Sequence, residues 1–378
     1  MKKIVLVLLA MLIAVPCLAF DGYEGHEGQI PFCQNNKTGA VKVASTKDID
    51  PTTGVNYEPH CNTRFMYGTT IPTETLIWVD IHGSQPAAPN PLQVALLRWY
   101  GANTAENSFP VGNFPVGVAF DGASIWVTNY GDANVTKLRA NDGSNLGTFP
   151  VGNSPNGVVF DGANIWVSNF DDATVTKLRA SDGTNLGTFT VGSNPQGVAF
   201  DGANIWVPNF GDNTVTKLRA SDGTNLGNFP VSGGPDGVAF DGANIWVASY
   251  SSGTVTKLRA SDGTNLGSFS AGAGPIGVAF DGANIWVTNQ DGNQVWKLRA
   301  SDGATLGHFL VGFWSQGIAF DGVNIWVASY SSGAVTKLRA SDGTNLGTFP
   351  VGSNPFGVAF DGANIWVTNT NSNSVSKL

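Results

Sequence analysis

The chain has 378 residues, of which only 13% are charged, and it carries a formal net charge of −8 at pH 7. Nucleic acids and anionic membranes bind basic surfaces that displace counterions. A net negative chain with few charges is therefore unsuited to either of them as its main partner. The length suffices for one large all-β domain together with a small additional segment.

The first 19 residues have the pattern of an export signal. Two lysines precede an apolar run over residues 4–15, which is short for a transmembrane helix, and the small residue Ala19 ends the segment. We therefore expect a signal peptide over residues 1–19 that is cleaved. This predicts a periplasmic or secreted protein with no integral membrane segment after cleavage.

All three cysteines lie in the first 61 residues. Cys17 is an alternative site of lipid attachment, but Pro16 stands where such sites favour a small residue. Cys33 and Cys61 remain in the mature chain and predict one disulfide, because exported proteins with an even cysteine count commonly pair them. The competing interpretation is a zinc site that adds nearby histidines, namely His26, His60 and His82. Adjacent residues such as His60 and Cys61 point to opposite sides of an extended chain, so we expect no metal and no cofactor.

Residues 20–89 lack the periodicity that fills the rest of the chain, and we interpret them as a separate small Cys-paired module. Alternating apolar residues predict strands over 40–44 and 75–81. The pattern becomes helical over 90–103, where Asn90 and Pro91 suit a helix start and several apolar residues share one face. We expect a short helical linker there.

The stretch GVAFDGANIWV, residues 197–207, recurs at a spacing of 40 residues. Its near-copies begin at Gly117, Gly157, Gly237, Gly277, Gly317 and Gly357. A period of this size indicates repeats that cannot bury their apolar faces alone and must stack on neighbours.

Each repeat contains four strand-like runs separated by turns. In the third repeat they are residues 197–200, 205–209, 215–220 and 226–231, with Asp-Gly pairs as turn signals. We therefore predict an all-β, seven-bladed propeller of four-stranded blades over residues 104–378. We expect the repeated tryptophan, Trp206 in this copy, to fill the wedge between blades.

Two basic residues recur on the third strand, here Lys217 and Arg219. Seven lysines and six arginines, thirteen side chains in matching places, suggest a polyanion site. Each pair, however, lies near the aspartate of the next turn, here Asp222, on a strand far from the axis. We expect both side chains to lie on a solvated face and to pair within the blade.

The two ends of the array predict how the ring closes. The last repeat stops after its third strand, and NSFPVG at residues 107–112 matches the fourth strand GTFPVG at 147–152. One N-terminal strand and three C-terminal strands thus complete the seventh blade and remove exposed sheet edges. We expect a monomer.

The motifs IWVTN at residues 125–129 and ANIWVTN at 363–369 carry a resemblance to known repeats. Residues 104–378 resemble the seven-bladed propellers of the YVTN and NHL-like repeat families, with tryptophan in place of the usual tyrosine. They are more distantly similar to virginiamycin B lyases. The resemblance implies the fold but no particular activity, because those families include partner-binding proteins and enzymes.

Sequence variation among the seven repeats gathers in two loops, between the fourth and first strands and between the second and third. In a propeller both loops emerge on one face, around the mouth of the central channel, where we place the candidate ligand site. Just before the innermost strand the variable residues are Val116, Asn156, Gln196, Asp236, Ile276, Gln316 and Phe356. The acid and amides among them suit a sugar or a weakly held cation, or are solvated loop residues.

The second loop places aromatics at five of seven equivalent positions: Tyr130, Phe170, Phe210, Tyr250, Gln290, Tyr330 and Thr370. They suit contact with a glycan or a protein, or packing against the adjacent blade. One repeat departs further, with Phe313-Trp314-Ser315 in place of the usual Asn-Pro. These two aromatics are either an anchor for a partner or a docking patch for the N-terminal module.

Two classes of function remain, a non-enzymatic exported binding module and a lyase or lactonase working at the channel mouth. General acid–base catalysis at neutral pH favours a positioned His or Glu. From residue 103 onward the sequence has one histidine, His308, and one glutamate, Glu106, and both fall in or beside outermost-strand positions. We therefore predict no catalytic residues and favour a scaffold that binds a protein or a glycan.

Overall fold

The computed structural model describes residues 29–35, 41–43, 74–80 and 107–378. The chain divides into two units, Met1–Gly101 and Ala102–Leu378. In the first unit, β1 (Gln29–Asn35), β2 (Val41–Val43) and β3 (Glu74–Asp80) form an antiparallel sheet in the order β2-β1-β3. The sequence pattern predicts β2 and β3 but not β1, whose QIPFCQN carries a proline and lacks strict alternation.

Several N-terminal predictions fall outside the described residues. These are the signal peptide over 1–19, the helical linker over 90–103 and the cysteine at position 61. The disulfide between Cys33 and Cys61 therefore stays a prediction.

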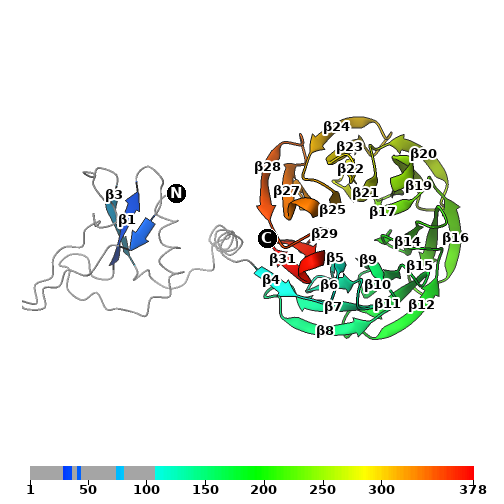
Figure 1. Cartoon of the computed structure of the whole chain (residues 1–378), viewed down its shortest axis with the longest axis horizontal. Helices are drawn as coiled ribbons and strands as arrows, with labels where there is room; N and C mark the ends of the chain where they lie inside the picture. Colours follow the sequence, from blue (N-terminus) through cyan, green and yellow to red (C-terminus); the bar gives the residue numbers. More distant parts are fainter. Residues whose placement is uncertain (1–28, 36–40, 44–73, 81–106) are drawn as a thin grey trace, which may run out of the picture. The chain divides into compact units, whose positions relative to one another are not determined.

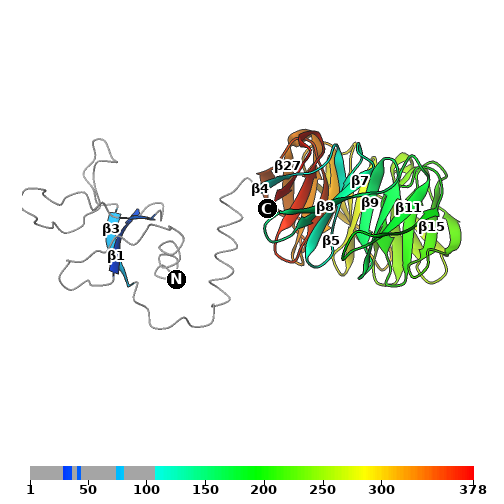
Figure 2. The same cartoon turned by 90° about the horizontal axis from the view of Figure 1, so that it is seen from below.

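The second unit is a ring of seven four-stranded antiparallel sheets around one axis, as predicted (Figure 1). Figure 2 shows the same blades from the side, standing next to one another around the ring. Blade 1 contains β5 (Pro115–Phe120), β6 (Ser124–Asn129), β7 (Asn134–Arg139) and β8 (Asn145–Pro150). Blade 2 contains β9 (Pro155–Phe160), β10 (Asn164–Asn169), β11 (Thr174–Arg179) and β12 (Asn185–Thr190). Blade 3 contains β13 (Ala199–Phe200), β14 (Asn204–Asn209), β15 (Thr214–Arg219) and β16 (Asn225–Pro230).

The remaining blades follow the same order, with one strand taken from the other end of the chain. Blade 4 contains β17 (Pro235–Phe240), β18 (Asn244–Ser249), β19 (Thr254–Arg259) and β20 (Asn265–Ser270). Blade 5 contains β21 (Pro275–Phe280), β22 (Asn284–Asn289), β23 (Gln294–Arg299) and β24 (Thr305–Leu310). Blade 6 contains β25 (Ser315–Phe320), β26 (Asn324–Ser329), β27 (Ala334–Arg339) and β28 (Asn345–Pro350). Blade 7 contains β29 (Pro355–Phe360), β30 (Ile365–Asn369), β31 (Ser374–Lys377) and β4 (Asn107–Pro110).

Short 3-10 helices follow the second strand in three blades: η2 (Tyr250–Ser252), η3 (Tyr330–Ser332) and η4 (Thr370–Ser372). Adjacent strands of a blade are antiparallel, so its connections leave alternately from two edges. We call one edge of the ring the loop face; it carries the variable loops, such as 111–114 and 130–133 in blade 1. The opposite edge, the turn face, carries the Asp-Gly turns, such as 121–123 and 140–144.

The predicted closure is confirmed at blade 7. β4 pairs with β31, with Phe109 opposite Val375, and the backbone N–H of Val111 donates to the carbonyl of Asn373 at 3.0 Å. The ring centroid of Phe109 lies 5.5 Å from that of Trp366, which matches the Trp126–Phe149 pair inside blade 1 at 5.4 Å. The N-terminal strand therefore occupies the place that a fourth strand of blade 7 would hold.

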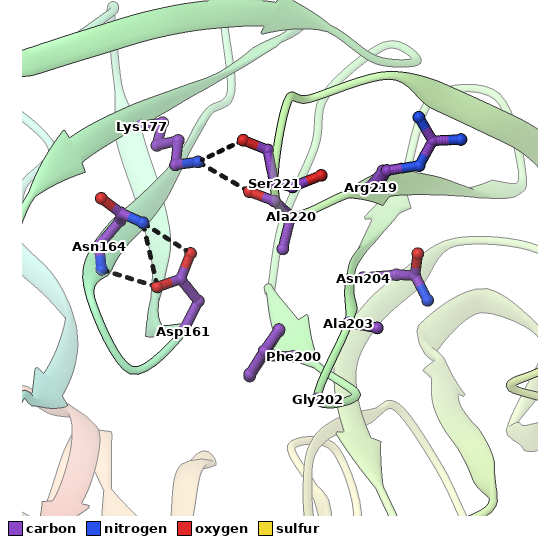
Figure 3. A pocket seen from close by; sticks show the side chains of 10 residues that line it. All are labelled: Asp161, Asn164, Lys177, Phe200, Gly202, Ala203, Asn204, Arg219, Ala220 and Ser221. Carbon is purple, nitrogen blue, oxygen red and sulfur yellow. Dashed lines mark hydrogen bonds between the residues drawn. The ribbon is translucent and has the colours of Figure 1, made fainter.

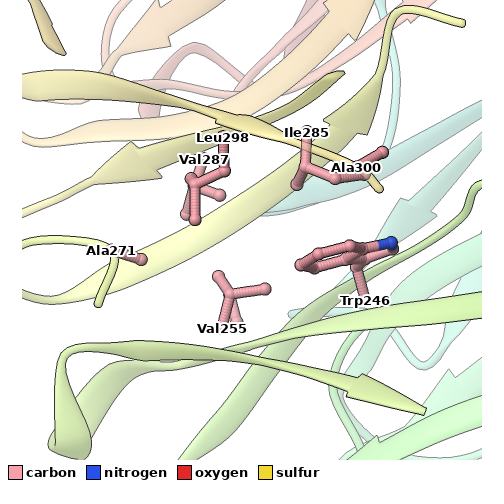
Figure 4. Packing of buried hydrophobic residues seen from close by; sticks show 8 residues of the cluster. Trp246, Val255, Ala271, Ile285, Val287, Leu298 and Ala300 are labelled. Atoms are coloured by element: carbon pink, nitrogen blue, oxygen red, sulfur yellow. The ribbon is translucent and has the colours of Figure 1, made fainter. Parts of the chain in front are cut away.

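The hydrophobic core lies in the seams between blades. At the seam of blades 4 and 5, Trp246 and Val255 of one blade meet Ile285, Val287 and Leu298 of the next, all fully buried (Figure 4). The indole N–H is not left unpaired, because Trp246 donates to Asp241 Oδ2 at 2.7 Å. The same indole–carboxylate hydrogen bond occurs in all seven blades. The predicted wedge of tryptophans is confirmed.

The structure corrects the prediction for the repeated lysines and confirms it for the arginines. Arg219 pairs with Asp222 at 3.0 Å on an exposed surface within the blade. Lys217 is only 5% exposed, and its Nζ lies 4.9 Å from the Trp206 ring centroid while donating to Ala260 O of the next blade at 2.7 Å. The lysine is thus buried at the seam, because an indole face and backbone carbonyls replace its water shell.

Blade 3 is irregular at the axis. Its innermost strand β13 has two residues, whereas the innermost strands of the other six blades have six. Pro208 on the facing strand β14 stands where other blades have Thr, Ser or Ala, and proline has no N–H to donate. Beyond β13 the pairing continues only through an isolated bridge between Pro195 and Asn209 and a hydrogen bond from Gln196 N to Pro208 O at 2.9 Å.

Seven glycines bring the innermost strands into backbone contact. A Cβ placed on Gly237 would lie 2.0 Å from the carbonyl oxygen of Ile276, whereas one on Gly197 would lie 3.0 Å from that of Asp236. The same approach closes the ring, since a Cβ on Gly357 would lie 2.3 Å from Val116 O. The equivalent glycines are Gly117, Gly157, Gly197, Gly237, Gly277, Gly317 and Gly357.

Replacing Gly237 with alanine should destabilise the ring more than the same change at Gly197. A methyl group at Gly237 must push apart two backbones, which costs about 1–3 kcal/mol. At Gly197 the added methyl group would lie farther from the neighbouring carbonyl oxygen, so we expect a smaller loss of stability there. Thermal unfolding of the two single variants measures the difference, and equal melting temperatures would contradict the proposed backbone contact.

A buried asparagine at the end of the second strand ties the loop face together in blades 1, 2 and 3. In blade 1 Asn129 accepts from Gly112 N at 3.1 Å and donates to Thr136 Oγ1 at 2.8 Å. Blades 4 and 6 have Ser249 and Ser329 instead, and both hydroxyls are buried without a hydrogen-bond partner. In blade 4 the neighbouring glycine is also replaced, by Ser232, which fills space that an asparagine would need.

Ser329→Asn should stabilise the protein by about 1 kcal/mol, because the longer side chain reaches Gly312 N and Thr336 Oγ1. Ser249→Asn should destabilise it, since Ser232 stands in the way, and the double change Ser232→Gly/Ser249→Asn should recover the loss. Melting temperatures of the three variants provide the measurement. Stabilisation by Ser249→Asn alone would overturn this explanation.

Candidate functional site

The loop face brings three of the predicted polar residues together at the channel mouth. Asn156 Nδ2 donates to Gln196 Oε1 at 2.7 Å across the seam of blades 2 and 3. Asp236 follows at the same position of blade 4, where its backbone carbonyl accepts from Gly197 N at 3.2 Å. We call Asn156, Gln196 and Asp236 the polar sector, and it coincides with the irregular innermost strand of blade 3.

Among the acidic side chains in the described part of the chain, Asp236 has the most strongly shifted pKa. The residue as a whole is partly exposed, but protein surrounds its carboxyl, and this desolvation raises the pKa of the carboxyl to about 7. Acids with such values gather at functional sites, although buried acids elsewhere also show them.

The fourth predicted polar residue, Gln316, does not join this group. It belongs to blade 6, where it is 4% exposed and its backbone carbonyl accepts from Thr288 Oγ1 at 2.6 Å. Its neighbours around the inner ring are Ile276 and Phe356, followed by Val116. The channel mouth is therefore polar over blades 2–4 and largely apolar over blades 5–7 and 1.

The predicted aromatics of the second loop are half-buried and contact their surroundings. Tyr130 lies 6.3 Å from Phe170 of the next blade between ring centroids, and Tyr330 lies 6.0 Å from Trp314. Desolvation raises the pKa of Tyr250, and so does Asp291, to which the tyrosine hydroxyl donates at 3.4 Å. Packing between loops accounts for much of their placement and leaves part of each ring exposed.

Backbone strain singles out two exposed aromatics on the loop face. In every blade, the residue three positions before the glycine that opens the repeated GVAF stretch, such as Gly117, has a positive φ of between 51° and 68°. Five blades place Ser, Asn or Gly there, but blade 1 has Phe114 at φ 51° and blade 6 has Trp314 at φ 55°. Left-handed backbone costs a bulky residue about 1–2 kcal/mol more than glycine. Packing does not explain them, because Phe114 is 51% exposed and Trp314 50%.

With Phe313, which is 65% exposed, these residues form what we call the aromatic sector, Phe114, Phe313 and Trp314, in blades 1 and 6. Phe313 and Trp314 were predicted from the sequence, and Phe114 was missed. The repeat alignment contained the signal, since Phe114 occupies the same position as Trp314. The alternative of docking by the N-terminal module involves residues that mostly lie outside the described ranges.

The one histidine within residues 107–378 lies on an outermost strand. His308 is on the outermost strand β24 and stacks on Trp296 with ring centroids 5.7 Å apart. Within residues 107–378 and the three described N-terminal strands, no three His, Cys, Asp or Glu side chains gather as a metal site. The same residues contain no helix long and apolar enough to span a membrane.

The turn face holds hollows that the sequence did not predict. One of about 600 Å³ lies at the seam of blades 2 and 3, between Asp161 and Asn164 on one side and Phe200 and Arg219 on the other (Figure 3). A second of about 600 Å³ repeats it at the seam of blades 3 and 4. Their residues are nearly constant among repeats, so variability between repeats gave no signal there.

Comparison with known proteins supports the fold. No family model matches the sequence, and no curated protein matches it. Among solved structures, a streptogramin B lyase matches with a TM-score of 0.63 and 15% identity, over 72% of this chain and 96% of that one. Hydrazine synthase of Kuenenia stuttgartiensis matches with a TM-score of 0.63 and 17% identity, over 73% of this chain and 97% of that one. Virginiamycin B lyase of Staphylococcus aureus matches with a TM-score of 0.62 and 17% identity, over 72% of this chain and 97% of that one.

These likenesses show a seven-bladed propeller similar to that of virginiamycin B lyase. The resemblance to YVTN and NHL-like repeats stays a prediction. At such low identity the comparisons carry the fold alone.

The raised pKa of Asp236 predicts a pH-dependent stability. Its carboxyl titrates near pH 3.8 when unfolded and near 7 when folded, so the folded state binds the extra proton between these values. Stability from this group is therefore present below about pH 4 and is lost as the pH rises to about 7. Asp236→Asn should remove this slope and raise the melting temperature at pH 8 relative to wild type. If the melting temperatures of the two proteins changed with pH in the same way across this range, the raised pKa of Asp236 would be contradicted.

Proposed function

We propose that this protein is an exported, non-enzymatic binding scaffold whose loop face docks a protein partner around the channel mouth. The observation that carries the proposal is the aromatic sector, in which Phe114 and Trp314 stay exposed although their backbone conformation disfavours large side chains. Residues that oppose the stability of their own loop are typical of functional positions.

A protein partner fits this surface better than a glycan does. Trp and Phe are the side chains that most often anchor protein interfaces, since they bury a large apolar area at a small entropic cost. The half-buried tyrosines, Tyr130 and Tyr330, extend the same surface with amphipathic rings. A glycan ligand at this face remains an outcome of the experiment below.

The triple change Phe114→Asn/Phe313→Ser/Trp314→Asn tests the proposal with residues that other blades already use at these positions. We expect it to abolish partner binding and to raise the melting temperature, because Asn tolerates the left-handed backbone. The measurement is capture of secreted and periplasmic proteins on the immobilised chain, followed by titration of the captured protein, with a glycan array in parallel.

The matched control is Val323→Ala, which trims an apolar side chain that is 67% exposed on the turn face. It should leave binding unchanged. Equal affinity of the triple variant and wild type would refute the aromatic sector as the docking surface, and binding of glycans alone would replace the proposed ligand class.

A second candidate function is a lyase or lactonase activity at the polar sector. Asp236 favours it, because an acid with a pKa of about 7 at a channel mouth suits proton transfer at neutral pH. Turnover of streptogramin B or of a simple lactone, lost in Asp236→Asn, would support this function. We favour the scaffold, since desolvation alone raises the pKa of Asp236, with no contribution from a neighbouring charged group.

A further inference from the structure

The hollows of the turn face repeat one set of side chains at successive seams. At the seam of blades 2 and 3 the lining includes Asp161, Asn164, Lys177, Phe200, Arg219 and Ser221. The next seam presents Asp201, Asn204, Lys217, Phe240, Arg259 and Ser261. The sequence supplies the same residue types at the seam of blades 4 and 5. A ligand suited to one hollow therefore meets the same residue types at the neighbouring seams.

The charges in each hollow are already compensated by the protein. Asp161 accepts from Trp166 Nε1 at 2.8 Å and from the Asn164 backbone at 2.7 Å, which lowers the pKa of its carboxyl against the opposing effect of desolvation. Lys177 Nζ donates to Ala220 O at 2.7 Å and lies against the indole ring of Trp166. The exposed arginine pairs with the aspartate of its own turn at 3.0 Å. No strong unpaired charge remains to hold an ionised ligand.

The groups that remain available suit a neutral polyhydroxyl ligand. Figure 3 shows Phe200 between the two turns that border the hollow, with Ser221 above it. The side-chain oxygen of Asn164 and the hydroxyl of Ser221 make no other hydrogen bond, and Arg219 uses one terminal nitrogen in its ion pair. Gly202 leaves the entrance open, since a Cβ there would meet nothing within 4 Å.

We propose that the seam hollows of the turn face are subsites for neutral sugar residues of a polysaccharide. An aromatic ring takes the C–H face of a sugar, while amide, hydroxyl and guanidinium groups bond its hydroxyls. Each open hollow binds weakly, and the repetition of subsites on one rigid ring gives the polymer its affinity. This binding is independent of the loop face and of any protein partner there.

Native affinity electrophoresis of the full chain tests the proposal, with the polysaccharide cast in the gel. The neutral probes are dextran, mixed-linkage β-glucan, galactomannan and arabinoxylan, and the charged comparator is polygalacturonate. We expect at least one neutral polymer to retard the protein and polygalacturonate not to. Ser221→Trp/Ser261→Trp fills two hollows and should weaken the retarding interaction by about threefold or more.

The control Thr188→Trp/Asn228→Trp places the same side chains on the exposed outermost strands β12 and β16, away from the seams, and should bind like wild type. The triple change in the aromatic sector should also leave retardation intact, which separates this inference from the proposed function. Melting curves confirm that each variant is folded. Absence of retardation by every neutral polymer, preference for polygalacturonate, or equal weakening by the control pair would overturn the proposal.

Discussion

The buried indole at each seam is the interaction on which the rest of the ring depends. It supplies a large apolar surface to two blades at once, and its N–H is held by the carboxylate of the preceding turn, as Trp246 is by Asp241 at 2.7 Å. The lysine of the next strand covers the ring and reaches the following blade, with Lys257 donating to Ala300 O at 2.7 Å. One residue type thus fixes the distance between sheets, the conformation of a turn and the attachment of the neighbour.

The axis adds a second constraint, because the innermost strands approach until backbones touch. Where a side chain would separate them the sequence has glycine, and blade 3 shows what a local change does. There Pro208 interrupts the pairing of the innermost strand. The contact with the next blade is also looser, since a Cβ placed on Gly197 would lie 3.0 Å from Asp236 O. The polar sector lies at this place. A less regular inner strand leaves side chains such as Gln196 and Asp236 room at the channel mouth without disturbing the seams.

The sequence predicted the fold well because periodicity is a local property of the chain. The number of blades, the order of their strands and the closure by β4 all follow from repeated letters. The buried role of Lys217 was not predictable in the same way, since its partner is a backbone carbonyl 43 residues away that has no sequence signature. β1 was missed for lack of alternation. For the candidate site, variability located the loop face and its aromatics, whereas the strain at Phe114 required the backbone conformation.

The two faces of the ring meet different physical demands, and this explains their different sequences. Turns on the turn face hold the tryptophans through their aspartates, as Asp161 holds Trp166, so losing such an aspartate weakens a seam, and the Asp-Gly pair after the first strand is present in all seven copies. Loops on the loop face carry residues as different as Gly274 and Trp314 at one position. A surface with the same residues at successive seams suits the repeating polymer that we propose as its ligand. A surface that differs from blade to blade suits the single protein partner that we propose for the loop face, where the left-handed backbone of Trp314 costs stability.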